Sequence, residues 1–156
     1  MHLTMERLGK ITYKTTPTLY KVRPSDLDSL GHVNNAVALE YFELGRFDWV
    51  KQNSFTLPKN LIAVVTQLNV VYLKEIFVND IKIITTLAKT SYYELIFEQQ
   101  VLTINSPSNS PSEPEKNQER ECVTATIHVA LIDKNKKRPV KLTGLFADED
   151  ESAPSV

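Results

Sequence analysis

Cysteine is nearly absent from this chain of 156 residues, and long hydrophobic runs are absent altogether. The single cysteine, Cys122, cannot form an internal disulfide or a cysteine-based metal cage, so a reducing compartment is expected. Because no run of 18 apolar residues occurs, the sequence predicts no transmembrane helix. The opening segment, MHLTMERLGKITYK, lacks the apolar core of a signal peptide. The sequence therefore predicts a cytoplasmic protein without a membrane span.

An excess of charge of one sign is also missing. The 18 Lys and Arg residues nearly balance the 19 Asp and Glu residues, which gives a net charge of −1. Proteins that bind nucleic acid usually carry a basic excess on one face, so a nucleic-acid partner is not expected. The chain contains 42% hydrophobic and 24% charged residues, as ordinary globular proteins do. Composition thus predicts a globular protein and says nothing about its reaction.

One long helix is predicted between Asn35 and Gln52. Apolar and small residues recur there with the spacing of a single helical face, namely Ala38, Phe42, Gly45 and Trp49. Other segments are rich in Val, Ile, Thr and Tyr, which favours strands. These segments are Thr18–Val22, Leu61–Leu73, Ile81–Lys89, Tyr92–Ile104 and Cys122–Ile132.

The predicted fold class is α+β, with a curved antiparallel sheet covering the one long helix. The turns at Asn79-Asp80 and Thr90-Ser91 are short, which favours antiparallel pairing of the strands that they join. Such a sheet leaves an edge strand and an apolar face uncovered, so two copies are expected to join their sheets.

The length predicts a single domain over residues 1–156. The segment Asn105–Arg120 holds four Ser, three Pro and three Glu and no residue that could pack, which predicts a mobile hairpin loop. The end of the chain, residues 147–156, is acidic and is expected to be frayed.

The densest polar cluster lies directly before the predicted helix, where the free backbone N–H groups of a helix start point. These donors could stabilise an oxyanion that forms on a substrate carbonyl. A carboxylate on the preceding loop, such as Asp28, could attack the same carbon or deprotonate a water. The cluster consists of Asp26, Asp28, His32, Asn34 and Asn35.

Each of these residues also has a structural interpretation. One of Asn34 and Asn35 is expected to cap the helix, and Gly31 to supply a positive φ angle in the turn. His32 could bond a backbone carbonyl, and an Asp in a polar turn usually stabilises that turn. Nothing else in the chain repeats this density of possible ligands, so neither a metal site nor a cofactor is expected.

The stretch VRPSDLDSLGHVNNAVALEYFELGRFDWV resembles the signature of the hotdog-fold acyl-CoA thioesterases of the 4-hydroxybenzoyl-CoA thioesterase type. The shared pattern is D-x-D-x-x-G-H-V-N-N, followed by a helix with an aromatic-Glu pair and an Arg. The His-Val-Asn-Asn run is similar in particular to the long-chain acyl-CoA thioesterase branch. The resemblance covers about residues 15–143, although Ile76 and Asn79 stand where the family usually has Pro and Gly.

The resemblance implies a hotdog thioesterase that hydrolyses acyl-CoA or acyl-carrier-protein thioesters and assembles as a homodimer, with a tetramer as the alternative. It implies that Asp28 acts as nucleophile or general base and that the Asn35 amide polarises the carbonyl, with Gly31 or His32 nearby. Acyl-binding residues would be Tyr41, Phe42, Leu68 and Val70. Coenzyme A would lie near Lys89, Thr90 and Ser91 or near the basic run at residues 134–138.

Three other functions remain open at this point. A hotdog dehydratase or hydratase would pair Asp28 with His32. A non-catalytic protein that binds acyl thioesters would need no reactive residue. A phosphatase could use Asp26-Leu27-Asp28, but that chemistry requires a parallel sheet and a metal site, which the antiparallel pattern does not favour.

Overall fold

The computed structural model describes residues 5–8, 11–104 and 119–142, and the side chains from residue 13 onward within these ranges. The predictions of a mobile loop at Asn105–Arg120 and of a frayed tail at residues 147–156 therefore fall largely or wholly outside the described residues. The elements are β1 (Met5–Leu8), β2 (Ile11–Lys14), β3 (Thr16–Lys21), the 3-10 helix η1 (Pro24–Asp26), α1 (Asn35–Gln52), β4 (Leu61–Tyr72), β5 (Asp80–Thr90), β6 (Glu94–Ile104), β7 (Arg120–Asp133) and β8 (Arg138–Pro139).

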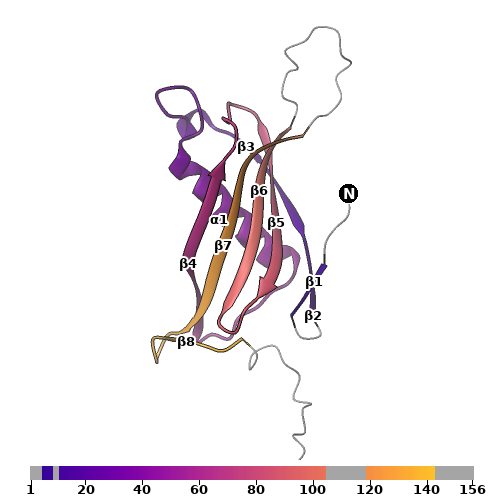
Figure 1. The fold of residues 1–156 in the computed structure, drawn as a ribbon, viewed down its shortest axis with the longest axis vertical. Helices are drawn as coiled ribbons and strands as arrows, with labels where there is room; N and C mark the ends of the chain where they lie inside the picture. Colours follow the sequence, from indigo (N-terminus) through magenta and orange to yellow (C-terminus); the bar gives the residue numbers. More distant parts are fainter. Residues whose placement is uncertain (1–4, 9–10, 105–118, 143–156) are drawn as a thin grey trace, which may run out of the picture.

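The main sheet is antiparallel, with its strands in the order β3-β5-β6-β7-β4 and with β8 paired to the end of β7. Its strands curve, and α1 crosses behind them against one face (Figure 1). The predicted α+β class, with a curved antiparallel sheet around one long helix, is confirmed.

The helix begins and ends where the sequence predicted, and the predicted stripe faces the sheet. Ala38 is 2% exposed, and Phe42 and Trp49 are fully buried. Gly45 lies at the closest approach, because a Cβ atom there would come within 2.7 Å of Ile83 Cγ2 and of Thr85 Oγ1. The aromatic rings provide most of the apolar area of this face, and the glycine allows the helix to reach the sheet.

The sequence analysis missed one hairpin and predicted one strand pairing wrongly. The hairpin of β1 and β2 has no counterpart among the predicted strands. The strands on either side of Asn79-Asp80 are not neighbours, because β5 pairs with β3 and β6, whereas β4 lies at the far edge beside β7. The connection is a crossover in which Ile76 is buried and its carbonyl accepts the Val33 N–H at 2.8 Å. The short turn at Thr90-Ser91 does join paired strands, as predicted.

The sheet has two ends, named here after their place in Figure 1. Lys21 pairs with Asp80 at the upper end, and Leu61 pairs with Asp133 at the lower end. Strand β5 has 11 residues, so the two ends lie roughly 33 Å apart at about 3.3 Å per residue.

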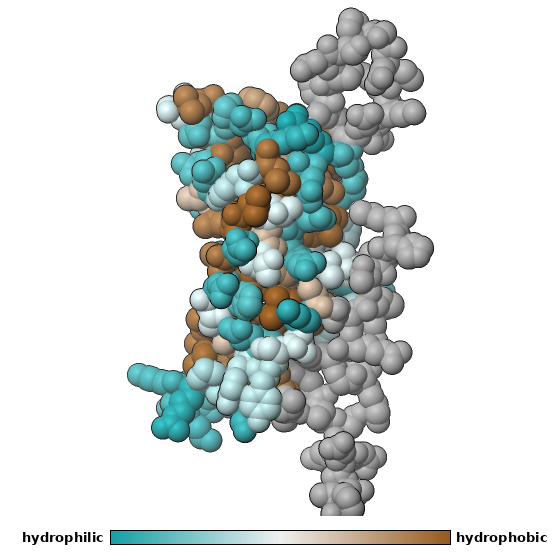
Figure 2. Space-filling model, in the orientation of Figure 1, coloured by the Kyte–Doolittle hydropathy of each residue, from teal (hydrophilic) through white to brown (hydrophobic). Residues whose placement is uncertain are grey.

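Strand β4 is an edge of the sheet that α1 does not cover. Its apolar side chains point to both faces and remain exposed, and Val65 and Leu68 are 40% and 45% exposed. Brown apolar atoms accordingly line the side of the molecule that β4 forms (Figure 2). Among the described residues, no helix is both long and apolar enough to cross a membrane.

Candidate functional site

A tight loop precedes the helix and presents Asp28. The loop closes where Leu27 bridges Val33, and the Asp28 N–H donates to the His32 carbonyl at 2.7 Å. The Gly31 N–H donates to the Asp28 carbonyl at 3.1 Å, and Gly31 has a φ of +80°. The predicted positive φ of Gly31 is confirmed, because the chain must turn back within five residues here.

The carboxylate of Asp28 holds this loop with one of its two oxygens. Oδ1 accepts the N–H groups of Leu30 at 2.9 Å and of His32 at 3.2 Å. Oδ2 has no hydrogen-bond partner among the described residues, and the side chain is exposed. The bonds through Oδ1 fix the carboxylate in orientation, so Oδ2 is free to react.

The start of α1 supplies backbone donors beside this loop. Asn34 is the helix cap, because its side chain accepts the Ala36 N–H at 2.8 Å. The prediction that Asn34 or Asn35 caps the helix is therefore confirmed. The Asn35 N–H, in the first residue of the helix, has no acceptor among the described residues. Together with the helix dipole, this N–H can stabilise negative charge on a bound carbonyl oxygen.

Asp26 has a structural environment that contrasts with that of Asp28. Its side chain is 2% exposed and accepts hydrogen bonds from the Arg23 backbone, the Arg23 guanidinium and the Tyr41 hydroxyl. Burial alone would raise the pKa of Asp26, but these hydrogen bonds and the Arg23 charge outweigh it and hold the pKa below its usual value. Its backbone carbonyl accepts the Asn34 N–H at 2.9 Å, so Asp26 anchors the helix start.

A cavity of about 240 Å³ joins the loop, the helix start and the end of β4. Its floor is apolar and buried, whereas its rim carries the carboxylate of Asp28 and other polar groups. The floor consists of Val33, Ala38, Ile76 and Val123, and the rim includes Asp28, His32, Asn35, Tyr72, Lys74 and Glu75. An apolar group on this floor would place an attached polar group beside both the carboxylate and the helix start.

The predicted catalytic residues thus lie together. Asp28, His32 and Asn35 line the cavity, and Gly31 shapes the loop that carries Asp28. The ring of His32 packs edge-on against Phe77, with 4.9 Å between the ring centroids. Within the described residues, no group of three or more His, Cys, Asp or Glu side chains could hold a metal ion.

Within a single chain, the predicted acyl-binding residues lie outside this cavity. Phe42 is fully buried in the core, and Tyr41 is 2% exposed with its hydroxyl on Asp26. Leu68 and Val70 lie on β4, outside the cavity.

The predicted coenzyme-binding residues lie at the lower end of the sheet. Lys89, Thr90 and Ser91 form the end of β5 and the following turn. Asp28 lies beyond the upper end, so within a single chain the two groups are separated by roughly the length of β5, about 33 Å. Exposed cations follow β7 at the same lower end, and we call Lys134, Lys136, Lys137 and Arg138 the lower basic cluster.

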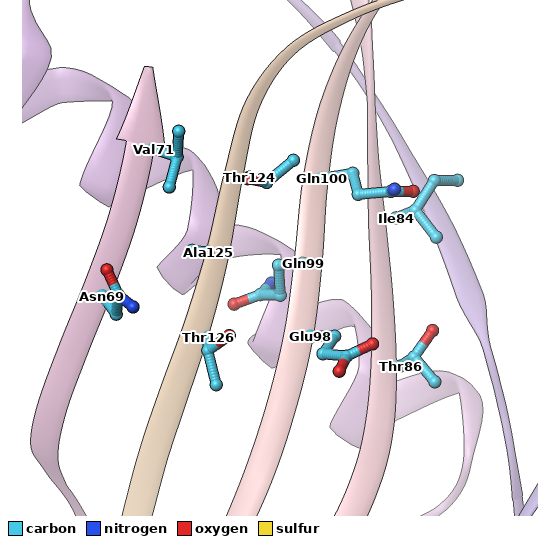
Figure 3. Close-up of a pocket in the computed structure, with 10 residues that line it drawn as sticks. All are labelled: Asn69, Val71, Ile84, Thr86, Glu98, Gln99, Gln100, Thr124, Ala125 and Thr126. Atoms are coloured by element: carbon cyan, nitrogen blue, oxygen red, sulfur yellow. The ribbon is translucent and has the colours of Figure 1, made fainter. Parts of the chain in front are cut away.

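A second hollow of about 260 Å³ lies on the face of the sheet that points away from α1 (Figure 3). Hydroxyl and amide side chains from β4, β5, β6 and β7 surround it, with Glu98 as its one carboxylate. Its lining contains no residue of α1, so it lacks the combination of carboxylate and helix start that marks the first cavity.

Sequence reasoning missed several residues of the cavity. Tyr72 ends β4, and its hydroxyl donates to the Asn35 carbonyl at 2.8 Å. Lys74, Glu75 and Ile76 come from the crossover to β5. Because the sequence predicted a hairpin turn at Asn79-Asp80, it gave no sign that these residues lie near the helix start.

Comparison with known proteins agrees with this architecture. A family model of the thioesterase-like superfamily matches residues 22–148. No curated protein matches the chain. Among solved structures, a DHNA-CoA thioesterase from Staphylococcus aureus is 22% identical, with a TM-score of 0.69 over 85% of this chain and 83% of its own. A probable thioesterase from Escherichia coli, YbaW, is 24% identical, with a TM-score of 0.68 over 83% of this chain and 92% of its own.

A 1,4-dihydroxy-2-naphthoyl-CoA thioesterase from Synechocystis shares the fold at 12% identity, with a TM-score of 0.67 over 82% of this chain and 89% of its own. At these identities the solved structures establish the fold. The family match spans most of the chain, including the Asp28 loop, α1 and all strands from β4 to β8. The chain therefore has the hotdog fold and belongs to the thioesterase-like superfamily.

Proposed function

We propose that this protein hydrolyses acyl thioesters, with Asp28 as the reacting carboxylate. One observation carries the proposal: Asp28, whose Oδ2 is unbonded among the described residues, and Asn35, whose N–H has no acceptor there, line one cavity with an apolar floor. Thioester hydrolysis requires a nucleophile or base on one side of the carbonyl and a donor for the oxyanion. Membership of the thioesterase-like superfamily supports the same chemistry.

The reaction can take two routes that use the same residues. In one route Asp28 Oδ2 attacks the carbonyl carbon, the thiolate leaves, and water then hydrolyses the mixed anhydride. In the other route Asp28 removes a proton from a water, which attacks the carbon and releases the thiol. The Asn35 N–H stabilises the oxyanion in both. After a single turnover in H₂¹⁸O, ¹⁸O in the Asp28 side chain would establish the first route, because water that attacks the Asp28 carboxyl carbon of the anhydride leaves its oxygen there.

The acyl carrier in this proposal is coenzyme A, for which the lower basic cluster and Lys89 would supply cations. These residues are far from Asp28 in one chain. If two copies pair antiparallel through β4, however, the lower end of one copy lies beside the upper end of the other. The carrier's phosphates would then contact the lower end of the partner while the thioester reaches Asp28.

The direct test is release of free thiol from acyl-CoAs of increasing acyl length, from acyl-pantetheines and from acyl-carrier protein. We expect the wild type to release thiol and Asp28→Asn to lose on the order of 10²-fold or more in kcat. The matched control is Asp80→Asn, an exposed Asp on β5 outside this cavity, which should retain activity.

Each result has a definite meaning. A higher kcat/KM for acyl-CoA than for acyl-pantetheine supports a role of the coenzyme A phosphates in binding. A higher kcat/KM for acyl-carrier protein would instead identify that protein, not coenzyme A, as the acyl carrier. Binding of acyl-CoA without turnover by the wild type would contradict hydrolysis and support a non-catalytic binding protein instead. Hydration of an enoyl thioester without hydrolysis would support a hydratase.

A further inference from the structure

The last residue of β4 links this strand to the first residue of α1. Tyr72 lines the same cavity as Asp28 and Asn35, and its hydroxyl donates to the Asn35 carbonyl at 2.8 Å. In the described part of the chain, this is the only hydrogen bond between β4 and α1. The helix instead packs against β3, β5 and β6.

Apart from the backbone bonds of the helix itself, few contacts hold the first helical residue. Asn34, Asn35 and Ala36 are all exposed, so side-chain packing does not hold this turn in place. Asn34 is fixed through its N–H to Asp26 and through its cap to Ala36. The bond from Tyr72 ties β4 to Asn35, a residue that lines the cavity and whose N–H has no acceptor among the described residues.

The same bond has an electrostatic effect. The Asn35 carbonyl oxygen carries partial negative charge in the first turn of the helix, and this charge opposes negative charge on a substrate bound at the helix start. A hydroxyl that donates to the carbonyl oxygen reduces this opposition, because its hydrogen compensates part of the negative charge.

We infer that Tyr72 is a positioning residue for thioester hydrolysis: its hydroxyl holds Asn35 so that the Asn35 N–H stabilises the oxyanion. The inference rests on the proposed function and adds a residue from β4 to it. Because Tyr72 acts through Asn35, it matters when the oxyanion forms and much less when the substrate binds.

The test compares Tyr72→Phe with the wild type on one acyl-CoA that the wild type hydrolyses. Loss of one hydrogen bond should lower kcat about three- to tenfold and leave KM within about twofold. Affinity for a trifluoromethyl ketone analogue of that acyl-CoA, whose hydrate resembles the tetrahedral intermediate, should fall by the same factor as kcat. Affinity for a non-hydrolysable thioether analogue should not change.

The control is Tyr13→Phe, which removes a tyrosine hydroxyl near Trp49, at the other end of the helix. It should leave kcat unchanged. If Tyr72→Phe equals the wild type in kcat, or if KM rises while kcat does not fall, the inference is overturned and the proposed function stands. If the wild type hydrolyses no thioester, the proposed function and this inference are both overturned.

Discussion

At the scale of single residues, two aspartates of one motif have different environments. The Asp26 side chain is buried and accepts five hydrogen bonds. The Asp28 side chain is exposed, and only one of its two carboxylate oxygens accepts hydrogen bonds from the described residues. The sequence pattern D-x-D gives both residues the same chemistry, and only burial and hydrogen-bond partners distinguish them. Asp26 thus stabilises the helix start, and Asp28 is left available for a substrate.

We predict that Asp26→Asn lowers the free energy of unfolding at pH 7 by about 2–3 kcal/mol, because hydrogen bonds to a buried charge are lost. The pKa of Asp26 in the folded protein is held below its unfolded value, which is about 3.9. The carboxylate therefore stabilises the fold above that pH, and this contribution is lost as the pH falls from about 4 toward the folded pKa.

Urea unfolding at a series of pH values checks this prediction. The difference between wild type and Asp26→Asn should shrink below about pH 4, whereas Asp80→Asn should cost little at any pH. A difference that stays constant from pH 7 to pH 3 would show that the charge of Asp26 is not what stabilises the loop.

At the scale of elements, the helix was predictable because its signal is local. The spacing of Ala38, Phe42 and Trp49 and the cap at Asn34 define α1 within one continuous segment. The position of β4 was not predictable from its segment, because its neighbour β7 lies about 60 residues further along the chain. The alternation and composition of β4 indicate a strand but do not identify its partner.

The candidate site follows the same rule. Asp28, His32 and Asn35 could be named from sequence because they share one short segment with the helix start. Tyr72 could not, because its contact with Asn35 depends on where the end of β4 lies in space.

We predict that Gly45→Ala destabilises the fold although alanine favours helices by about 1 kcal/mol over glycine. The added methyl group would meet Ile83 and Thr85 at 2.7 Å and the Gln99 amide nitrogen at 2.9 Å. Overpacking of this kind costs about 1–3 kcal/mol. We therefore expect a lower urea midpoint at an unchanged slope, and a midpoint equal to that of the wild type would mean that α1 can shift away from the sheet.

At the scale of the whole molecule, the open edge of the sheet requires an explanation. An edge strand has one side without a hydrogen-bonded neighbour strand. When its apolar residues are also exposed on both faces, it promotes aggregation unless another chain or element covers it. Strand β4 has this character over most of its length, whereas β3 at the opposite edge packs against α1. We predict that two copies pair through β4.

We expect Val65→Glu, a charge near the middle of β4, to convert the dimer into a monomer of unchanged secondary structure, measured by sedimentation and circular dichroism. The control is Leu19→Glu on β3, which places the same charge at a residue that is 71% exposed on the opposite edge. A wild type that sediments as a monomer, or a dimer that survives Val65→Glu, contradicts pairing through β4.

The same variant tests whether the two ends of the sheet cooperate across the dimer. In a monomer, Asp28 and the Tyr72–Asn35 bond are retained, but the partner's lower basic cluster is lost from the site. Hydrolysis of acyl-CoA by Val65→Glu should therefore show a raised KM. An acyl-pantetheine, which lacks the nucleotide phosphates, should lose less of its kcat/KM. Only acyl-CoA carries the phosphate charge that the lower basic cluster would bind. Equal losses of kcat/KM for both substrates would therefore show that the partner contributes to the shape of the acyl site and not to phosphate binding.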